Sequence, residues 1–455
     1  MALTKAYKAL TNPLARENFE KYGHPDGPQS LNTFFAIPQW FVEKRNYWKV
    51  VLLYFSAFIL IAPTSVVITW KNYRKYMDNK KVLRQSCEAY FRFTTGSLSS
   101  EGIMNVLSAS VEFVDLVVDL KIYDPSLQSI FRRVKLSSFH PKLTASYCQK
   151  SLALIAAHIH RLSLPSPVLS SQLKVVLLLP DLVRVGLVPV LSSKGYKETT
   201  LKAVYFLQMV TQALKENSSS LEMLPYITSD RILEREFKSR SGVSAIIEFV
   251  QIPLESKRAW LHDLTTQQLQ DVIAVSENLP YLKVDGKIGS DGEGVPVGSV
   301  VTVVIYIQRT TINEYISGRA KESKAQTVPK AKHTNGKPPF AYCPHFPSPL
   351  RESWLVALSG PRDEGFLCLP QFVDLLHGKA EIKMNFQAPI EKGRHNIEIE
   401  VMSNTYLGFC FKKMISITTC EKKVVEASSY DMEETESSQS SDVSAIESDS
   451  SEVEY

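Results

Sequence analysis

Residues 50–70 read VVLLYFSAFILIAPTSVVITW, a run of 21 residues without a charged side chain. An α-helix needs about 20 predominantly apolar residues to cross a hydrocarbon core of about 30 Å. Trp48 and Trp70 flank the run, as aromatic residues do at membrane interfaces. Pro63 lies inside the run, and membrane helices tolerate an internal proline. The sequence therefore predicts one transmembrane helix over residues 48–70.

Basic residues are more numerous after this helix than before it. Cytosolic flanks carry the excess of Lys and Arg, so we expect the C-terminal side to lie in the cytosol. The opening residues lack the apolar core and the cleavage site of a signal peptide, so we expect the helix to act as its own targeting signal. The side chains expected to anchor the helix at the membrane interfaces are Trp48, Trp70, Lys71, Arg74 and Lys75.

Charge is divided between a basic body and an acidic tail. The formal net charge is +5, yet residues 424–455 hold ten Asp or Glu and no Lys or Arg. The other residues therefore carry 52 basic and 37 acidic side chains, a balance of +15. Such a body suits nucleic acid or an anionic membrane leaflet. We favour a simpler interpretation, in which the basic residues are solvated at the surface or lie beside the membrane. Much of the positive charge flanks the helix or lies in residues 319–337.

The rest of the chain changes from helical to β patterning. Residues 71–230 show helical periodicity, for example TTLKAVYFLQMVTQALKEN (199–217), and predict a cytosolic helical bundle. The apolar stretch 175–191 resembles a second membrane span, but its prolines and charges favour buried helices. Residues 231–285 predict short helices packed as in helix-hairpin-helix motifs.

Residues 286–423 contain alternating segments such as VGSVVTVVIYIQR (297–309), which predict an antiparallel β-sandwich. We expect a long basic loop over 317–350 inserted between its strands. Residues 424–455 are Ser- and acid-rich, so they are expected to form a disordered acidic tail. The fold class that follows is an α+β membrane protein.

No pattern in the sequence indicates an active site. Neither a GxxxxGK[ST] loop nor a GxGxxG turn after a strand is present. His158 and His160 are two residues apart on a helical stretch, which places them on different faces and disfavours metal binding. Glu398 and Glu400 alternate with isoleucines, as solvent-facing strand residues do. We therefore expect a non-enzyme without catalytic, cofactor-binding or metal residues.

The six cysteines are widely spaced and include no CxxC pair. All lie on the side of the chain expected in the cytosol, where thiols stay reduced. We therefore expect free, mostly buried cysteines and no zinc site.

Several stretches together resemble the Sec63 family, the J-proteins of the endoplasmic reticulum translocon. These are AYKALTNPLARENFEKYGHPDGPQ (6–29), IPQWFVEKRN (37–46), ENLPYLKVDGKI (277–288), VGSVVTVVIYIQR (297–309) and NIEIEVMSNTYLGF (396–409). The resemblance implies that 1–30 is the C-terminal remnant of a lumenal J-domain and 31–47 a lumenal approach to the membrane. It also implies that the sandwich is fibronectin type III-like.

The tripeptide His24-Pro25-Asp26 spells the activating motif of J-domains, but it follows the helix that this motif should precede. Pro25-Asp26-Gly27 is typical of a turn, and we interpret it so. The resemblance then implies an N-terminally truncated form that begins inside the J-domain and lacks the activating loop. We do not expect this chain to stimulate the BiP chaperone.

The resemblance implies a non-catalytic subunit of the endoplasmic reticulum membrane, with its N-terminus lumenal and its C-terminus cytosolic. It would dock on the Sec61 channel, support post-translational translocation and bind Sec62 through the acidic tail. A complete family member would also recruit BiP through its J-domain. Ser444 and Ser451 are candidate phosphosites, because Glu447 and Glu454 follow them at the spacing of acid-directed kinases.

Two other classes stay open at this point. One is a nucleic-acid-associated accessory domain of RNA-helicase type, which the absent Walker motif and the apolar helix oppose. The other is a single-pass surface receptor with a fibronectin-like domain, which the charge flanks and the isolated cysteines oppose.

The orientation predicts that the sequon Asn217-Ser218-Ser219 stays unglycosylated, because it lies on the cytosolic side. Endoglycosidase should leave the mobility of the microsomal chain unchanged. As a control, Leu31→Asn creates a sequon with Asn32 and Thr33 on the lumenal arm and should add one glycan. A glycan on Asn217 would contradict the orientation.

Overall fold

The computed structural model describes residues 7, 10–24, 47–75, 81–117, 120, 125–134, 145–229, 242–289, 294–318, 337–360 and 365–421. The chain divides into two compact units, Met1–Arg84 and Gln85–Tyr455. The predicted approach segment 31–47, apart from Tyr47, and the acidic tail 424–455 lie outside the described residues.

The first unit contains two described helices, α2 (Pro13–Tyr22) and α3 (Tyr47–Lys75). Helix α2 begins at Asn12, whose side chain accepts the N–H of Leu14, and ends at Gly23 with a left-handed φ of +68°. His24 follows the end of this helix, as expected, whereas Pro25 and Asp26 lie outside the described residues.

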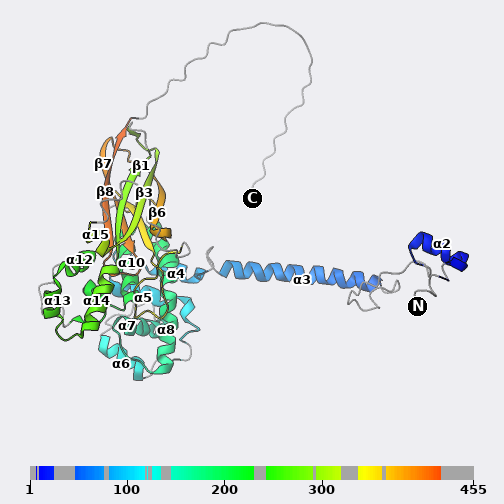
Figure 1. Cartoon of the computed structure of the whole chain (residues 1–455), viewed down its shortest axis with the longest axis horizontal. Helices are drawn as coiled ribbons and strands as arrows, with labels where there is room; N and C mark the ends of the chain where they lie inside the picture. The colour runs from blue at the N-terminus through cyan, green and yellow to red at the C-terminus, as the bar shows by residue number, and fades with distance from the viewer. Residues whose placement is uncertain are drawn as a thin grey trace, which may run out of the picture. The chain divides into compact units, whose positions relative to one another are not determined.

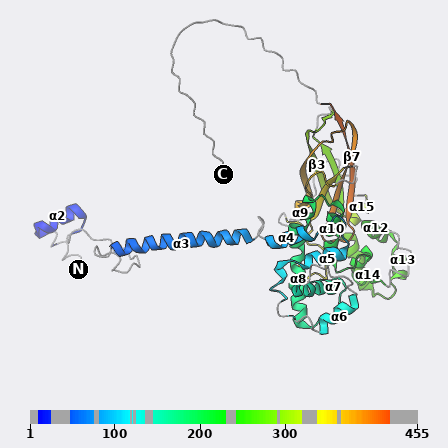
Figure 2. The same ribbon diagram turned by 180° about the vertical axis from the view of Figure 1, so that it is seen from behind.

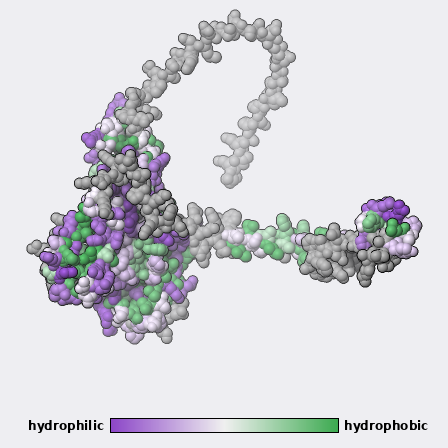
Figure 3. All heavy atoms as spheres, in the orientation of Figure 1, coloured by the Kyte–Doolittle hydropathy of each residue, from purple (hydrophilic) through white to green (hydrophobic). Residues whose placement is uncertain are grey.

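Helix α3 contains the predicted membrane span and continues to Lys75, five residues beyond it. The stretch Tyr47–Thr69 has a mean hydropathy of 2.3, and none of its most apolar part is buried within the structure. Figure 3 shows hydrophobic residues along the visible face of this helix. Its length and composition are sufficient to cross a membrane. Pro63 lies inside the helix, as predicted.

The second unit groups its helices at one end and its strands at the other (Figures 1 and 2). Helix α7 lies at the centre of the bundle, because residues 151–159 are all buried and α5, α6, α8 and α10 pack against it. The helices are α4 (Arg84–Phe93), α5 (Ser100–Ser108), α6 (Pro125–Val134), α7 (Ser146–Ile159), α8 (Ser166–Asp181), α9 (Val188–Ser193), α10 (Lys197–Gln212), α12 (Val243–Gln251), α13 (Leu254–Trp260) and α14 (Thr266–Asn278).

The second apolar stretch of the sequence forms buried helix, as predicted. Helix α8 continues through a π-helical turn, η4 (Leu182–Leu187), into α9. The combined helix Ser166–Ser193 is apolar and long enough to span a membrane, but 56% of its most apolar part is buried within the structure. Pro180 and Pro189 lack the N–H that an α-helical ladder requires, which accounts for the altered turn between them.

Two sheets form the other end of the second unit. The three-stranded sheet has the order β1-β3-β6 and the five-stranded sheet the order β2-β8-β7-β4-β5. All pairs are antiparallel except β2 with β8. The strands are β1 (Pro280–Ile288), β2 (Val295–Pro296), β3 (Val300–Thr311), β4 (Trp354–Ser359), β5 (Gln371–Val373), β6 (Lys379–Gln387), β7 (Gly393–Ser403) and β8 (Cys410–Cys420).

The two sheets face each other, because a Cβ added at Gly286 of β1 would lie 2.4 Å from Ile399 Cδ1 of β7. The buried residues of β3 alternate along the strand and point into the space between the sheets. Helices and antiparallel strands follow one another along the chain, which agrees with the predicted α+β class.

One boundary differs from the expected one, and one expected loop is partly packed. Strand β1 begins at Pro280, so residues 280–285 belong to the sheet and not to the helical region 231–285. Pro280 disfavours helical backbone in the residue before it, which ends α14 at Asn278.

The expected loop 317–350 follows α15 (Ile312–Ile316), and its residues 337–350 pack against the protein, with Phe346 buried. Residues 319–336 of this loop lie outside the described residues.

A buried set of hydrogen bonds joins the bundle to the sandwich. Gln208 of α10 donates its amide N–H to the Ser403 carbonyl (2.6 Å) and accepts the N–H of Gly408 (2.8 Å). Thr211 and Gln212 of the same helix donate to the Thr405 carbonyl. We call the contact of these α10 side chains with residues 403–409 the polar joint.

Two glycines allow the backbone to approach closely beside the polar joint. Gly242 precedes α12 with φ +69°, and Gly408 lies in the β7–β8 loop with φ +72°. A Cβ added at Gly242 would lie 2.1 Å from the Gly408 carbonyl oxygen. Backbone atoms cannot move aside as a flexible side chain can, so only glycine fits here.

Gly242→Ala should destabilise the second unit by roughly 3 kcal/mol, from the clash together with the left-handed backbone. The matched control is Gly195→Ala, where φ is +76° and no atom lies within 4 Å of the added Cβ. This control should cost only about 1 kcal/mol. Urea unfolding, followed by the fluorescence of the buried Trp260 and Trp354, measures both. Equal losses would show that the close approach does not matter.

Candidate interaction site

The described residues contain no group of three or more His, Cys, Asp or Glu that could hold a metal ion. His158 is buried and its Nε2 lies 2.8 Å from the Val210 carbonyl oxygen, whereas His160 lines a pocket. The two histidines therefore have different surroundings, as their spacing predicts. Burial, and secondarily the charge of Arg161, lowers the pKa of His158.

A largely enclosed ion pair lies within the sandwich. Arg309 of β3 donates to Glu352 through Nε (2.6 Å) and Nη2 (2.9 Å). The Tyr406 hydroxyl donates to the same carboxylate (3.1 Å) and accepts the N–H of Tyr342 (3.1 Å). Burial and the adjacent carboxylate raise the pKa of Tyr406 well above its usual range. Because every member has a partner, this network is structural, and no sequence pattern indicates its long-range pairs.

The expectation for Glu400 was wrong. Glu398 is half-buried, but Glu400 is 5% exposed and lies 3.2 Å from Lys412 Nζ on β8. The alternation fails because residues 400–403 lead into the polar joint, where both faces of β7 are covered. The Cys410 thiol donates to Glu400 (3.3 Å), and burial together with this carboxylate raises the pKa of Cys410.

The six cysteines are free, as expected, but only Cys87 and Cys148 are fully buried and the other four are half-buried. Burial raises the pKa of Cys87 to about 11 and that of Cys368 to about 11. These two thiols are therefore protonated at neutral pH and are poor nucleophiles.

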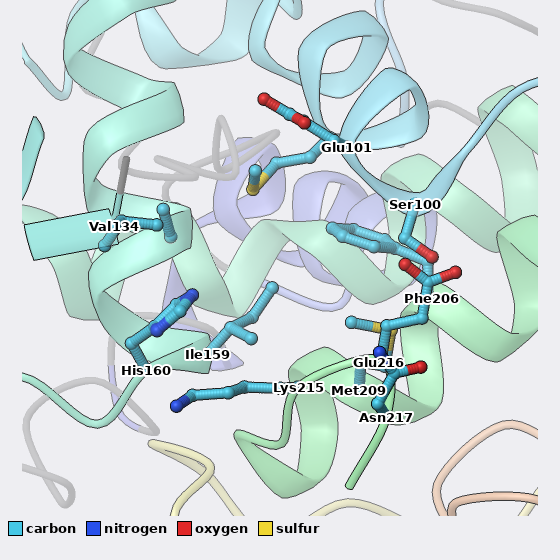
Figure 4. Close-up of a pocket in the computed structure, with 12 residues that line it drawn as sticks. Ser100, Glu101, Val134, Ile159, His160, Phe206, Met209, Lys215, Glu216 and Asn217 are labelled. Atoms are coloured by element: carbon cyan, nitrogen blue, oxygen red, sulfur yellow. The ribbon is translucent and has the colours of Figure 1, made fainter. Parts of the chain in front are cut away.

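A pocket of about 300 Å³ opens in the helical bundle between α5, α7 and α10 (Figure 4). Phe206, Met209 and Ile159 give it an apolar interior. In Figure 4, His160 and Lys215 lie on one side of the pocket and Glu101 on the other. The apolar interior of the pocket suits a small apolar group. The charged side chains that the figure labels at its rim do not form a catalytic pair.

The predicted membrane anchors lie in or beside the span. Trp48 is 63% exposed on α3, with Lys49 Nζ 5.9 Å from its ring centroid. Trp70, Lys71, Arg74 and Lys75 also lie in this helix, but their side chains are outside the described part. The candidate phosphosites Ser444 and Ser451 lie outside the described residues too. Their roles stay predictions.

The model of the Sec63 Brl domain matches residues 81–416, which include the helices from α4 onward and both sheets. The chain belongs to the Sec63 family. The translocation protein SEC63 homolog of Homo sapiens is 27% identical over 355 residues, which are 72% of this chain and 47% of that protein. The DnaJ protein ERDJ2B of Arabidopsis thaliana is 27% identical over 402 residues, which are 82% of this chain and 57% of that protein. The chain spans about half the length of these Sec63 relatives.

A third relative belongs to the class that the sequence left open. The U5 small nuclear ribonucleoprotein 200 kDa helicase of Homo sapiens is 25% identical over 328 residues, which are 70% of this chain but 14% of that protein. Among solved structures, the alkylpurine DNA glycosylase AlkC of Pseudomonas fluorescens aligns over 73% of this chain and 99% of its own, at 10% identity and a TM-score of 0.14. This score is too low to indicate a shared fold.

Within the Sec63 domain, the outward face of the β1-β3-β6 sheet is a candidate contact surface. It has a hollow of about 450 Å³ lined by Lys283, Tyr306, Lys379 and neighbouring residues. Aromatic residues are enriched at protein interfaces, so the exposed ring of Tyr306 supports a contact at this hollow.

The lowered pKa of His158 predicts a loss of stability in mild acid. Unfolded chains protonate histidine near its ordinary pKa of 6.5, but the folded chain does not bind this proton until a lower pH. The unfolded state is therefore favoured as the pH falls through about 6.5. The urea midpoint should fall between about pH 7 and pH 5.5.

His158→Gln should reduce this pH slope, because its amide N–H can still donate to the Val210 carbonyl. The matched control is Lys174→Gln at an exposed residue of α8, which removes no imidazole and should keep the parent slope. Some slope should persist in both variants, because burial also lowers the pKa of His160 and His345. An unchanged slope in His158→Gln would contradict the assignment.

Proposed function

We propose that this chain is a non-catalytic subunit of the endoplasmic reticulum protein translocon that supports post-translational movement of proteins into the lumen. The observation that carries the proposal is the match of the Sec63 Brl domain over residues 81–416. Relatives named translocation proteins and DnaJ proteins support it.

We infer a single span, formed by α3, with the N-terminus lumenal and the C-terminus cytosolic. The exposed apolar surface of α3 and the larger basic flank after it support this topology. The second candidate span, Ser166–Ser193, stays in the cytosolic bundle, because more than half of its most apolar part is covered by protein. Trp48, Trp70, Lys71, Arg74 and Lys75 then anchor α3 at the two interfaces.

The proposed contacts divide among the parts of the chain. The span packs beside helices of the Sec61 channel, and the sandwich touches the cytosolic loops of that channel. The approach segment 31–47 lies at its lumenal face. The acidic tail 424–455 binds a basic region of Sec62. Phosphate on Ser444 and Ser451 strengthens this binding. BiP is a partner only where a complete J-domain is present, and nucleic acid is not a partner.

Removing residues 424–455 should weaken recovery of Sec62 about tenfold and leave recovery of the Sec61 channel unchanged. The tail holds ten carboxylates, and their attraction is screened within about 8 Å at physiological salt. The measurement is co-purification from mildly solubilised microsomes at low and high salt.

The matched control keeps the length of the tail and replaces its ten carboxylates with amides. It should behave like the deletion if charge is the cause. Unchanged recovery of Sec62 with the chain that lacks 424–455 would contradict the binding of Sec62 by the tail. Failure to recover the channel with the intact chain would contradict the proposed function itself.

A further inference from the structure

The outward face of the three-stranded sheet carries lysines in a repeated pattern. Strands β1 and β6 each place a Lys-acid-Lys series on alternate residues, so the three side chains point to the same side. The strand between them, β3, contributes a tyrosine. We call the following residues the basic sheet face: Lys283, Lys287, Lys379, Lys383 and Tyr306.

Two carboxylates lie within this face and do not neutralise it. The register places Asp285 and Glu381 on either side of Tyr306. Asp285 Oδ1 lies 3.8 Å from Lys413 Nζ, which brings a fifth lysine to the face. Five lysines against two carboxylates leave a local charge of +3. The face therefore attracts an acidic segment.

The basic sheet face also carries exposed apolar side chains, which are not needed to keep edge strands from pairing with other sheets. Lysines on edge strands discourage pairing between sheets, and β1 and β6 are edge strands. This role does not account for Tyr306 and Val300, which are 40% and 75% exposed on the middle strand. Lys287 Nζ lies 5.9 Å from the Tyr306 ring centroid. Tyr306 lies between these cations and Val300 lies at the start of β3, and an exposed aromatic ring is a feature of many binding surfaces.

The acidic tail leaves the sandwich at one end of this face. Strand β8 ends at Cys420, whose carbonyl accepts the N–H of Val297 (2.9 Å), three residues before β3 begins. Residues 300–308 of β3 extend about 27 Å at about 3.3 Å per residue. Residues 424–455, if extended, reach about 100 Å, so eight or nine of them are enough to cover the face.

We propose that the acidic tail 424–455 binds the basic sheet face of its own chain. Its ten carboxylates match the lysines, and its Tyr430, Val443 and Ile446 can contact Tyr306 and Val300. The tether raises the effective concentration of the tail to the millimolar range, so a weak contact is populated. The binding weakens with salt, because the charges lie at the surface.

This contact has a consequence that rests on the proposed function. One tail segment cannot bind the sheet face and a basic partner at the same time. A basic partner that captures the tail therefore uncovers the face. The binding of the tail to the face lies within this chain and is testable without any translocon component.

The test uses the full chain in detergent micelles and a variant that lacks 424–455. The probe is a fluorescent synthetic peptide of residues 424–455. It should bind the tail-less chain at low salt and bind the full chain at least about tenfold more weakly, because the tethered tail occupies the face. In the tail-less chain, Lys287→Glu with Lys383→Glu should weaken peptide binding at least about tenfold.

The matched control is Lys174→Glu with Lys215→Glu, which reverses two exposed lysines of the bundle and should change the affinity less than about twofold. Unchanged urea midpoints verify that the variants fold. If Lys287→Glu with Lys383→Glu unfolds the chain, Lys287→Gln with Lys383→Gln takes its place. Equal affinity for the full and tail-less chains would overturn the proposal. Equal losses of peptide affinity in the sheet-face and bundle variants would also overturn the proposal. The tail would then bind any positively charged surface and not this face in particular.

Discussion

The architecture of the second unit depends on the polar joint between α10 and residues 403–409. Gln208, Thr211 and Gln212 are buried, and each makes a hydrogen bond to the backbone of this loop. A buried amide without partners costs about 1–3 kcal/mol, so these side chains stabilise one arrangement of bundle and sandwich and penalise others. Apolar contacts alone tolerate sliding, but directional hydrogen bonds fix position. The close approach of Gly242 and Gly408 adds a steric condition to the same contact.

The sandwich depends on a second buried network, formed by Arg309, Glu352 and Tyr406. Glu352 is buried and Arg309 is half-buried, so removal of Arg309 would leave an uncompensated buried charge. The Tyr406 hydroxyl connects this pair to the loop that α10 holds. The two networks therefore meet in residues 403–409, a segment that belongs to the stretch 396–409 by which the sequence resembles the Sec63 family.

Sequence patterns predicted what depends on local composition. The apolar run 50–70 forms helix α3, and the prolines and charges of 175–191 correctly indicated a helix largely buried in protein. The pattern could not show that Gln208 in α10 pairs with Gly408, 200 residues away. Alternation also misplaced Glu400, because it assumes one solvent-facing side along the whole strand. At the interaction site, the register that groups lysines of β1 and β6 around Tyr306 is a property of the fold.

The directional character of the polar joint also has a mechanical consequence. Separating the bundle from the sandwich would break several hydrogen bonds together and leave buried amides without partners until water reached them. Because these bonds all join one helix to one loop, we expect the bundle and the sandwich to move together when a partner pulls on either of them.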